Sequence, residues 1–355
     1  MARAARLLAA ALAASLLGGC STVGTRTLPM DRFDFTESVS RSWREQILLN
    51  IVKARYGEVP TFVEVAQIVT GYEARSEVRV SGDFNLYNPT DFFGAGGTAS
   101  WVDRPTLTYS PLTGEKFTRV ILVPIPSSAI LLLLQAGYRA DLVMDTLVQS
   151  VNGHVNPRSP VASAASAASR FPRIVELLKR IQAAGGLDFR VDPGEKDAKP
   201  MTLMVLRSAE VPGASAEVEE LRSILGIPPD RIEVPLVNGV LPGRNGEVTM
   251  FCHSTLQVLL AMGNGVEVPP DHVEAGWAFP ARPGPPMPDD YRLRVRSGDS
   301  PPGDALVSVR HLGRWFWVSQ DDLASKRALV VLGLMLRALE TGEGGKAPIL
   351  SISTN

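Results

Sequence analysis

The chain has 355 residues, 45% of them hydrophobic, which places it well above the range of disordered proteins. Its 36 Lys and Arg residues are balanced by 37 Asp and Glu residues, so we expect no basic surface for nucleic acid. The length is typical of two domains or one large domain.

The N-terminus has the pattern of a secretory signal. Arg3 and Arg6 precede an uncharged run over residues 7–17, and small residues follow it. A membrane-spanning helix needs about 20 apolar residues, so the pattern predicts a cleaved signal peptide over residues 1–19. The alternative is an ordinary signal cut at Ala11-Leu12-Ala13, which would leave very little apolar run and a spare thiol at Cys20.

The residues Leu17-Gly18-Gly19-Cys20 resemble the lipobox of bacterial lipoproteins. In that family the cysteine takes a diacylglycerol through a thioether, the signal is cut before it, and the freed amine takes a further acyl chain such as palmitate. The resemblance implies lipidation of Cys20, with residues 20–30 as a tether. Two or more acyl chains anchor a protein stably, at about 0.8 kcal/mol per buried methylene. Ser21 after the cysteine resembles the pattern sorted to the outer membrane.

Residues 31–156 are expected to form an N-terminal domain. Apolar residues at three- and four-residue spacing predict a helix over residues 36–56. Alternating residues then indicate largely extended chain over residues 61–110.

The segment 120–138 is free of charge and needs a separate interpretation. Pro124 and Pro126 divide it, which leaves a helical run too short to cross a bilayer. We interpret it as a strand, a turn and a buried helix, with a membrane-dipping hairpin as the alternative. A further helix is expected over residues 140–151.

Residues 157–169 are poor in large apolar groups and predict a linker before a C-terminal domain over residues 170–355. In that region, helical and alternating patterns follow one another. Helices are expected over 171–184, 216–225, 254–262 and 321–340, and strands over 202–207, 231–237, 247–252, 292–297, 305–310, 315–318 and 348–353. Ser254 is a plausible N-cap, and Ser319 and Asp322 have the spacing of a capping pair. The whole pattern predicts an α+β fold with largely antiparallel strands.

Two tryptophans in the last predicted strand pair are the strongest candidate for a binding site. On a strand, Trp315 and Trp317 share one face and Phe316 lies on the other. Two neighbouring indoles can stack on sugar rings, which would suit a protein that touches cell-wall glycan. We favour the simpler interpretation, in which both pack in the core against the helix that follows, as large aromatic side chains usually do.

Three further stretches resemble a group of bacterial lipoproteins to which no activity is attached. They are RYGEVPTF at 55–62, PTLTYSPLTGEKF at 105–117 and WFWVSQDDLASKR at 315–327. The resemblance runs across most of the mature chain and supports the lipoprotein assignment without adding any chemistry.

The sequence contains none of the common catalytic or metal-binding motifs that we looked for. The chain has no G-x-S-x-G, S-x-x-K, H-E-x-x-H or C-x-x-C motif. Cys252 and His253 are adjacent, but neighbours on a strand point to opposite faces, so we expect Cys252 to be a buried, inert thiol. His154, His253, His272 and His311 lack metal-ligand spacing. We therefore expect no catalytic residues, no metal and no cofactor.

The sequence thus predicts a lipid-anchored protein of the cell envelope, at the outer membrane and facing the periplasm, that binds or scaffolds an envelope partner. One alternative is a binder of, or an enzyme acting on, cell-wall glycan, with Trp315 and Trp317 as its platform. Another is an accessory subunit of an export or surface assembly.

Overall fold

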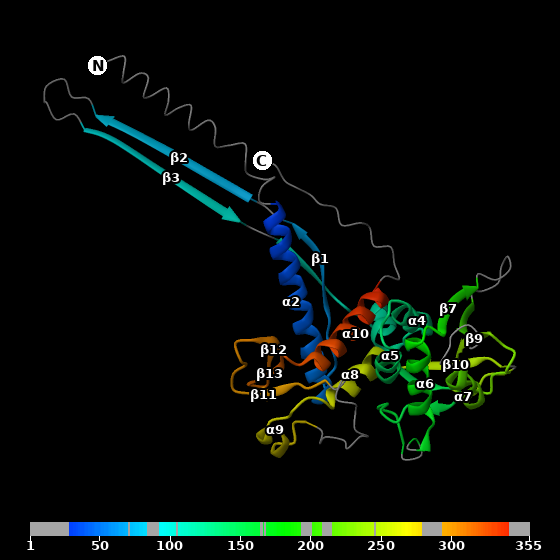
Figure 1. Cartoon of the computed structure of the whole chain (residues 1–355). Coiled ribbons are helices and arrows are strands. Elements are labelled where there is room, and N and C mark those ends of the chain that lie inside the picture. Colours follow the sequence, from blue (N-terminus) through cyan, green and yellow to red (C-terminus); the bar gives the residue numbers. More distant parts are fainter. Residues whose placement is uncertain are drawn as a thin grey trace.

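The computed structural model describes residues 28–69, 72–83, 92–103, 106–163, 166, 168–192, 201–207, 215–244, 246–278 and 293–340. Over these residues, helices are mixed with mostly antiparallel strands, which confirms the predicted α+β class. Figure 1 shows a body of packed helices and sheets from which one long pair of strands projects. The predicted signal peptide, Cys20 and the predicted strand at 348–353 lie outside the described residues.

The elements follow one another in this order along the chain. The helices are α2 (Leu28–Arg55), α3 (Gly114–Phe117), the π-helix η1 (Thr118–Leu122), α4 (Ser127–Gln135), α5 (Ala140–Leu147), α6 (Phe171–Ala183), α7 (Ser215–Leu225), α8 (Thr255–Gly263), α9 (Pro270–Glu274) and α10 (Leu323–Glu340). The strands are β1 (Val63–Val69), β2 (Tyr72–Asp83), β3 (Phe92–Asp103), β4 (Thr106–Pro111), β5 (Val148–Val151), β6 (His154–Val155), β7 (Leu187–Asp192), β8 (Met201–Leu206), β9 (Glu233–Asn238), β10 (Val248–Cys252), β11 (Arg296–Gly298), β12 (Ala305–His311) and β13 (Arg314–Ser319).

Helix α2 lies at the centre of the N-terminal part. It has 28 residues, a length of about 42 Å, and begins within the segment predicted as a tether. Leu48, Ile51 and Val52 in its second half are fully buried, and the helix contacts α8, α10 and β12. Gly263 of α8 lies directly against the backbone of α2, where a Cβ would be 3.5 Å from the carbonyl oxygen of Ile51.

Two amide side chains on α2 hold the chain that leads into β1. The Asn50 amide donates to the Thr61 carbonyl at 2.8 Å and accepts from the Thr61 N–H at 2.7 Å. One turn earlier, Gln46 makes the same pair of bonds with Val63, at 3.0 Å and 2.8 Å. The backbone groups of Thr61 and Val63 thus have hydrogen-bond partners on α2, in place of those that a neighbouring strand would supply.

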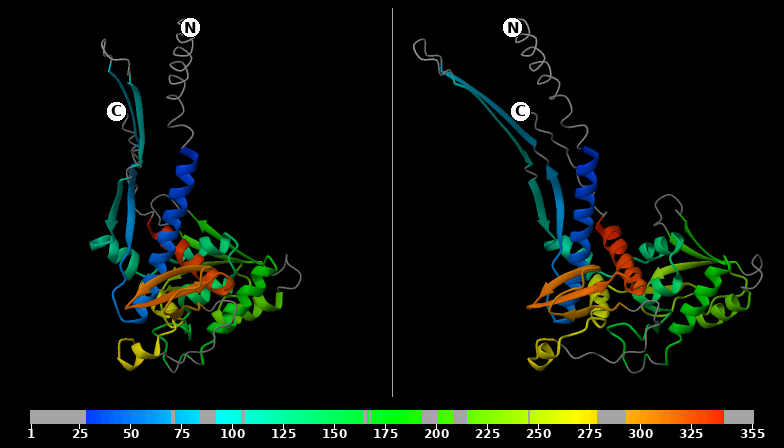
Figure 2. Two further views of the ribbon diagram at one scale, coloured as in Figure 1. Left: turned by 90° about the vertical axis from the view of Figure 1, so that its left-hand side faces the viewer. Right: turned by 60° about the vertical axis from the view of Figure 1, so that its left-hand side comes forward.

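Strands β2 and β3 form the projecting hairpin. They pair antiparallel from Tyr72 opposite Asp103 to Asp83 opposite Phe92, with no shift in register. Strands β1 and β4 pair in the same way closer to the body, with one bulge between Val65 and Gln67. Figures 1 and 2 show that β1 and β4 run beside α2, whereas β2 and β3 extend beyond its N-terminal end.

The segment between the two predicted domains departs from the prediction in two places. Residues 118–122 form the π-helix η1, where a strand was predicted, and the helix α4 then follows as predicted. The helix predicted over residues 140–151 ends at Leu147, and its last four residues form β5. Val148 and Val151 are buried within a sheet, because β5 pairs with β10, about a hundred residues later in the chain.

That sheet has six strands in the order β6-β5-β10-β9-β8-β7, and only β9 and β10 run parallel. Helix α6 packs between α5 and α7. The segment 157–169, predicted as a linker, connects two parts of this sheet, since β5 and β6 precede it and β7 to β10 follow it. Strands of both predicted domains therefore share one set of backbone hydrogen bonds.

The C-terminal part consists of a three-stranded antiparallel sheet, order β11-β13-β12, and the helices around it. Ser254 is the N-cap of α8, as the sequence predicted, and the structure adds a capping box with Gln257. The start of α10 differs from the predicted pairing of Ser319 with Asp322. There the Asp322 carboxylate itself caps the helix, accepting from the Ser325 N–H at 3.0 Å and from the Ser325 hydroxyl at 2.8 Å.

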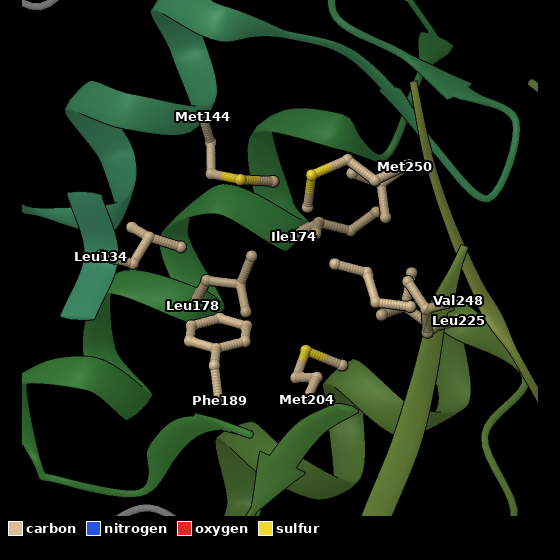
Figure 3. Close-up of a pocket in the computed structure, with 11 residues that line it drawn as sticks. Leu134, Met144, Ile174, Leu178, Phe189, Met204, Leu225, Val248 and Met250 are labelled. Atoms are coloured by element: carbon tan, nitrogen blue, oxygen red, sulfur yellow. The ribbon is translucent and has the colours of Figure 1, made fainter. Parts of the chain in front are cut away.

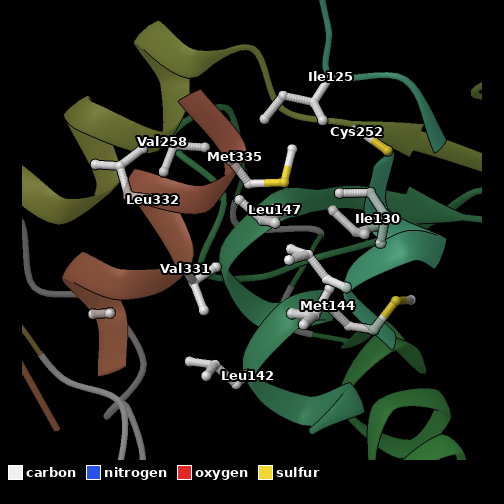
Figure 4. Close-up of a cluster of buried hydrophobic side chains, with 14 of the residues drawn as sticks. Ile125, Ile130, Leu142, Met144, Leu147, Cys252, Val258, Val331, Leu332 and Met335 are labelled. Atoms are coloured by element: carbon white, nitrogen blue, oxygen red, sulfur yellow. The ribbon is translucent and has the colours of Figure 1, made fainter. Parts of the chain in front are cut away.

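Helix α10 is a core element. Leu332 and Met335 are 1% exposed and lie near Val258 of α8 and Leu147 of α5 (Figure 4). Its closest backbone neighbours are α2, α5 and η1, whereas the sequence predicted that it would pack on the strand carrying the tryptophans. Helix α2 lies beside that sheet instead, in contact with β12.

Replacing Asn50 by alanine is expected to lower the free energy of unfolding by about 3 kcal/mol, because the N–H and the carbonyl of Thr61 would both lose their partner. Urea unfolding followed by circular dichroism measures the change. Arg41→Ala, at an exposed position of the same helix, is the matched control and should change stability by less than about 0.5 kcal/mol. Equal midpoints for the two variants would contradict the role given to the Asn50 amide.

Candidate functional site

The alternation of β13 separates its side chains onto two faces. Phe316 and Val318 are fully buried, and the Phe316 ring meets the Tyr56 ring edge-on at 6.0 Å between centroids. Trp315 and Trp317 lie on the other face and are half-buried. The buried aromatic residue of this strand is therefore Phe316, between the two tryptophans that the sequence singled out.

The neighbouring strands complete the tryptophan face, by which we mean Trp315, Trp317, Arg296, Arg310 and Gly298. Arg296 of β11 lies opposite Trp317, and Arg310 of β12 lies opposite Trp315. A Cβ at Gly298 would come within 3.2 Å of the Trp317 ring, so the indole lies across the glycine. Each indole thus has a guanidinium residue beside it, on opposite sides of the central strand.

The charge of this face comes from the two exposed arginines. Within the described part of the chain, neither Arg296 nor Arg310 forms an ion pair, whereas the nearby Arg314 pairs with Asp271 at 3.0 Å and with Asp299. The hydrogen bond from Arg314 lowers the pKa of the Asp271 carboxyl. Flat apolar rings flanked by exposed guanidinium groups are suited to sugar rings or planar groups that carry negative charge.

A polar aromatic cluster joins the buried side of this sheet to α2. Tyr56 Oη lies 2.6 Å from His272 Nδ1, and the Tyr56 ring meets the His311 ring edge-on at 5.2 Å. Burial, followed by the Asp271 charge, raises the pKa of Tyr56 to about 12. His311 Nε2 lies 3.0 Å from a Glu58 carboxylate oxygen. Tyr56 and His272 are buried and bonded to each other, so we interpret the cluster as a structural junction.

Cys252 and His253 do not act on each other. Cys252 is 1% exposed, and burial raises the pKa of its thiol to about 12, which is the environment expected for an inert cysteine. His253 instead lies 2.9 Å from Ser159 Oγ through Nε2 and 3.2 Å from the Thr146 carbonyl oxygen through Nδ1. Burial lowers the pKa of His253 to about 4.

The Ser159–His253 contact has the atoms of a nucleophile and a base, but its surroundings are structural. Both side chains are buried, and Ser159 Oγ also accepts from the Val161 N–H at 3.4 Å. Arg158 pairs with the buried Asp145 at 2.7 Å, and the Asn156 amide donates to the carbonyl of Val148. Together these bonds hold the chain after β6 against the body. No sequence motif announces this pair, because 94 residues separate its members.

A small cavity lies between the six-stranded sheet and its helices. Its volume is about 20 Å³, enough for one water molecule. Figure 3 shows only apolar side chains around it, among them Met144, Met204 and Met250. A lining without polar groups offers nothing to orient a ligand, so this space is a packing gap.

Among the described residues, no cluster of three or more His, Cys, Asp and Glu side chains is arranged to hold a metal ion. In the same part of the chain, no helix is both long enough and apolar enough to cross a bilayer. Comparisons with protein-family models, with curated proteins and with solved structures gave no match.

The free energy of unfolding is expected to depend on pH through His253. Its pKa is about 4 in the folded chain against 6.5 ordinarily, so the unfolded chain binds the proton first as the pH falls. Stability should therefore drop by about 3 kcal/mol between pH 6.5 and pH 4, and this part should be absent in His253→Gln.

Asp145 has the opposite effect on the pH dependence of stability, over an overlapping range of pH. Burial raises its pKa from 3.8 to about 6, so its contribution to stability falls as the pH rises through that window. The measurement is therefore the difference between wild type and His253→Gln at each pH, in which Asp145 contributes equally to both chains. A difference that stays constant from about pH 4 to pH 7 would contradict the burial of a neutral His253.

Proposed function

We propose that this protein is a lipid-anchored component of the cell envelope that acts by binding or scaffolding. The lipobox-like residues Leu17-Gly18-Gly19-Cys20 support the anchor. The binding role is supported mainly by two separate surfaces of the folded chain. These are the β2–β3 hairpin and the tryptophan face. Outer-membrane attachment, with the body facing the periplasm, is part of the same proposal.

The arrangement of α2 fits such an anchor. The helix begins at Leu28, eight positions after Cys20, and the hairpin projects past that same end of the helix (Figure 2). A lipid on Cys20 would therefore hold the hairpin toward the membrane and the body away from it. Envelope proteins near this membrane are the partners that the arrangement favours.

A second candidate function is binding of cell-wall glycan by the tryptophan face. Trp315 and Trp317 share one face of the sheet, and the exposed Arg296 and Arg310 flank them. Indole rings stack on the apolar faces of sugars, and the guanidinium groups would attract the carboxylates of cell-wall polymers.

The anchor is tested by substitution of each cysteine in turn. Cys20→Ser should abolish incorporation of labelled palmitate and leave the precursor unprocessed, because only a thiol can form the thioether. Cys252→Ser is the matched control and should still be labelled, since that thiol is buried in the body. If Cys20→Ser is still matured and still sediments with membranes, the lipoprotein assignment is wrong.

The glycan-binding role predicts that the Trp315→Ala, Trp317→Ala double variant loses affinity for purified cell-wall sacculi by about tenfold or more, as expected when two central aromatic contacts are removed. Co-sedimentation with sacculi measures it. Trp277→Ala is the control, because this indole is 52% exposed but packs against His272 of α9. If the wild type, the double variant and Trp277→Ala all bind sacculi equally, the tryptophan face has no role in glycan binding.

A further inference from the structure

We propose that copies of this chain assemble through their hairpins, with the outer edge of β3 in one copy hydrogen-bonded to the outer edge of β2 in the next. The occupant of each edge is thus a second copy of this chain. The inference deepens the proposed function and rests on its lipid anchor, which sets the orientation of the copies.

The hairpin offers two long edges. Among the described residues β2 and β3 form a sheet by themselves, so each strand has one neighbour and one outer edge of unpaired backbone groups. Twelve residues per strand give edges of about 40 Å. A two-stranded sheet standing alone is at best marginally stable in water, and additional strands are the ordinary means of stabilising it.

The β3 edge carries none of the usual protections against pairing over residues 92–102, and the β2 edge carries charges but no lysine, proline or bulge. Natural edge strands are commonly blocked by lysine, proline or a bulge. Residues 72–83 and 92–103 contain no lysine or proline, and their register is unbroken. The pairs β1–β4, β5–β10 and β12–β13 each contain a shift in register. With twelve residues per strand paired without a shift, the hairpin is the longest regular pairing in the described part of the chain.

The composition of the two strands favours pairing of β3 with β2 over pairing of like strands. Glu73, Arg75, Glu77 and Arg79 alternate along β2, so two copies of β2 side by side in the same direction would set like charges opposite one another. Residues 92–102 of β3 carry no charge and are small from Gly94 to Ser100. Such a strand accepts β2 of a neighbouring copy without repulsion.

The anchor decides the geometry of the assembly. Copies held in one membrane by their N-terminal ends share the same direction, and the hairpins project from that end (Figures 1 and 2). Adjacent hairpins of the same direction place β3 of one copy beside β2 of the next, running antiparallel. This contact is head-to-tail, so it leaves no edge free once a ring of copies closes.

Disulfide trapping between two differently tagged full-length chains tests the contact in native membranes. One chain carries Thr98→Cys in β3, and the other carries a single cysteine moved along β2 at Glu73, Arg75, Glu77 and Arg79. Oxidation is expected to link the two chains through at least one of these β2 positions. Each chain expressed alone, and a chain with Leu241→Cys in an exposed loop of the body, should give no linked product.

Palmitate labelling of the same membranes separates this inference from the proposed anchor. Labelled chains that form no link between β3 and any β2 position, or that link only Thr98→Cys to itself, would overturn the assembly and leave the anchor intact. Loss of labelling is the result that would overturn the anchor.

A second variant tests the assembly without new disulfides. Ala95→Lys with Ala99→Lys places two lysines on the β3 strand, and the mass of the native assembly should fall to that of single copies. Val240→Lys with Leu241→Lys, in an exposed loop, should leave the mass unchanged. Continued protection of Cys252 from a thiol reagent verifies that each variant is folded. An unchanged mass in the hairpin variant would overturn the inference.

Discussion

The backbone at Thr61 and Val63 must find hydrogen-bond partners, and two side chains of α2 provide them. Asn50 and Gln46 lie one turn apart, so their amides meet alternate residues of an extended chain, as a strand would. This contact ties β1, and with it the root of the hairpin, to the central helix. Because α2 also packs on α8, α10 and β12, the helix that holds β1 is the same one that organises the core.

The C-terminal sheet depends on α2 in a different way. Tyr56 directly follows the helix and lies among His272, His311 and Phe316, with its hydroxyl bonded to His272. A buried hydroxyl needs a partner, and His272 meets that need from a short helix more than two hundred residues later. On this side of the sheet Phe316 and Val318 point inward, and the alternation of the strand leaves Trp315 and Trp317 on its other face.

The interior and the surfaces of this protein therefore serve different purposes. The buried Cys252 and His253 are held in their uncharged forms by burial and participate in packing. Two features available to a partner are the tryptophan face, with its two exposed arginines, and the edges of the hairpin. Both are extended surfaces, which is why binding and assembly are the roles that we propose.

By itself, the sequence determined those elements that depend on near neighbours. The apolar stripe of α6, the N-cap at Ser254 and the alternation of Trp315, Phe316 and Trp317 were all predicted, because their partners lie within a few residues. Only the tertiary structure decided the π-helix η1, the strand at Val148–Val151 and the contact of His253 with Ser159. In these cases the deciding partners are distant in the chain, so local periodicity could not reveal them. The same holds for Asn50. In the sequence it is an ordinary polar residue of a helix, and only the fold shows that its side chain bonds to Thr61.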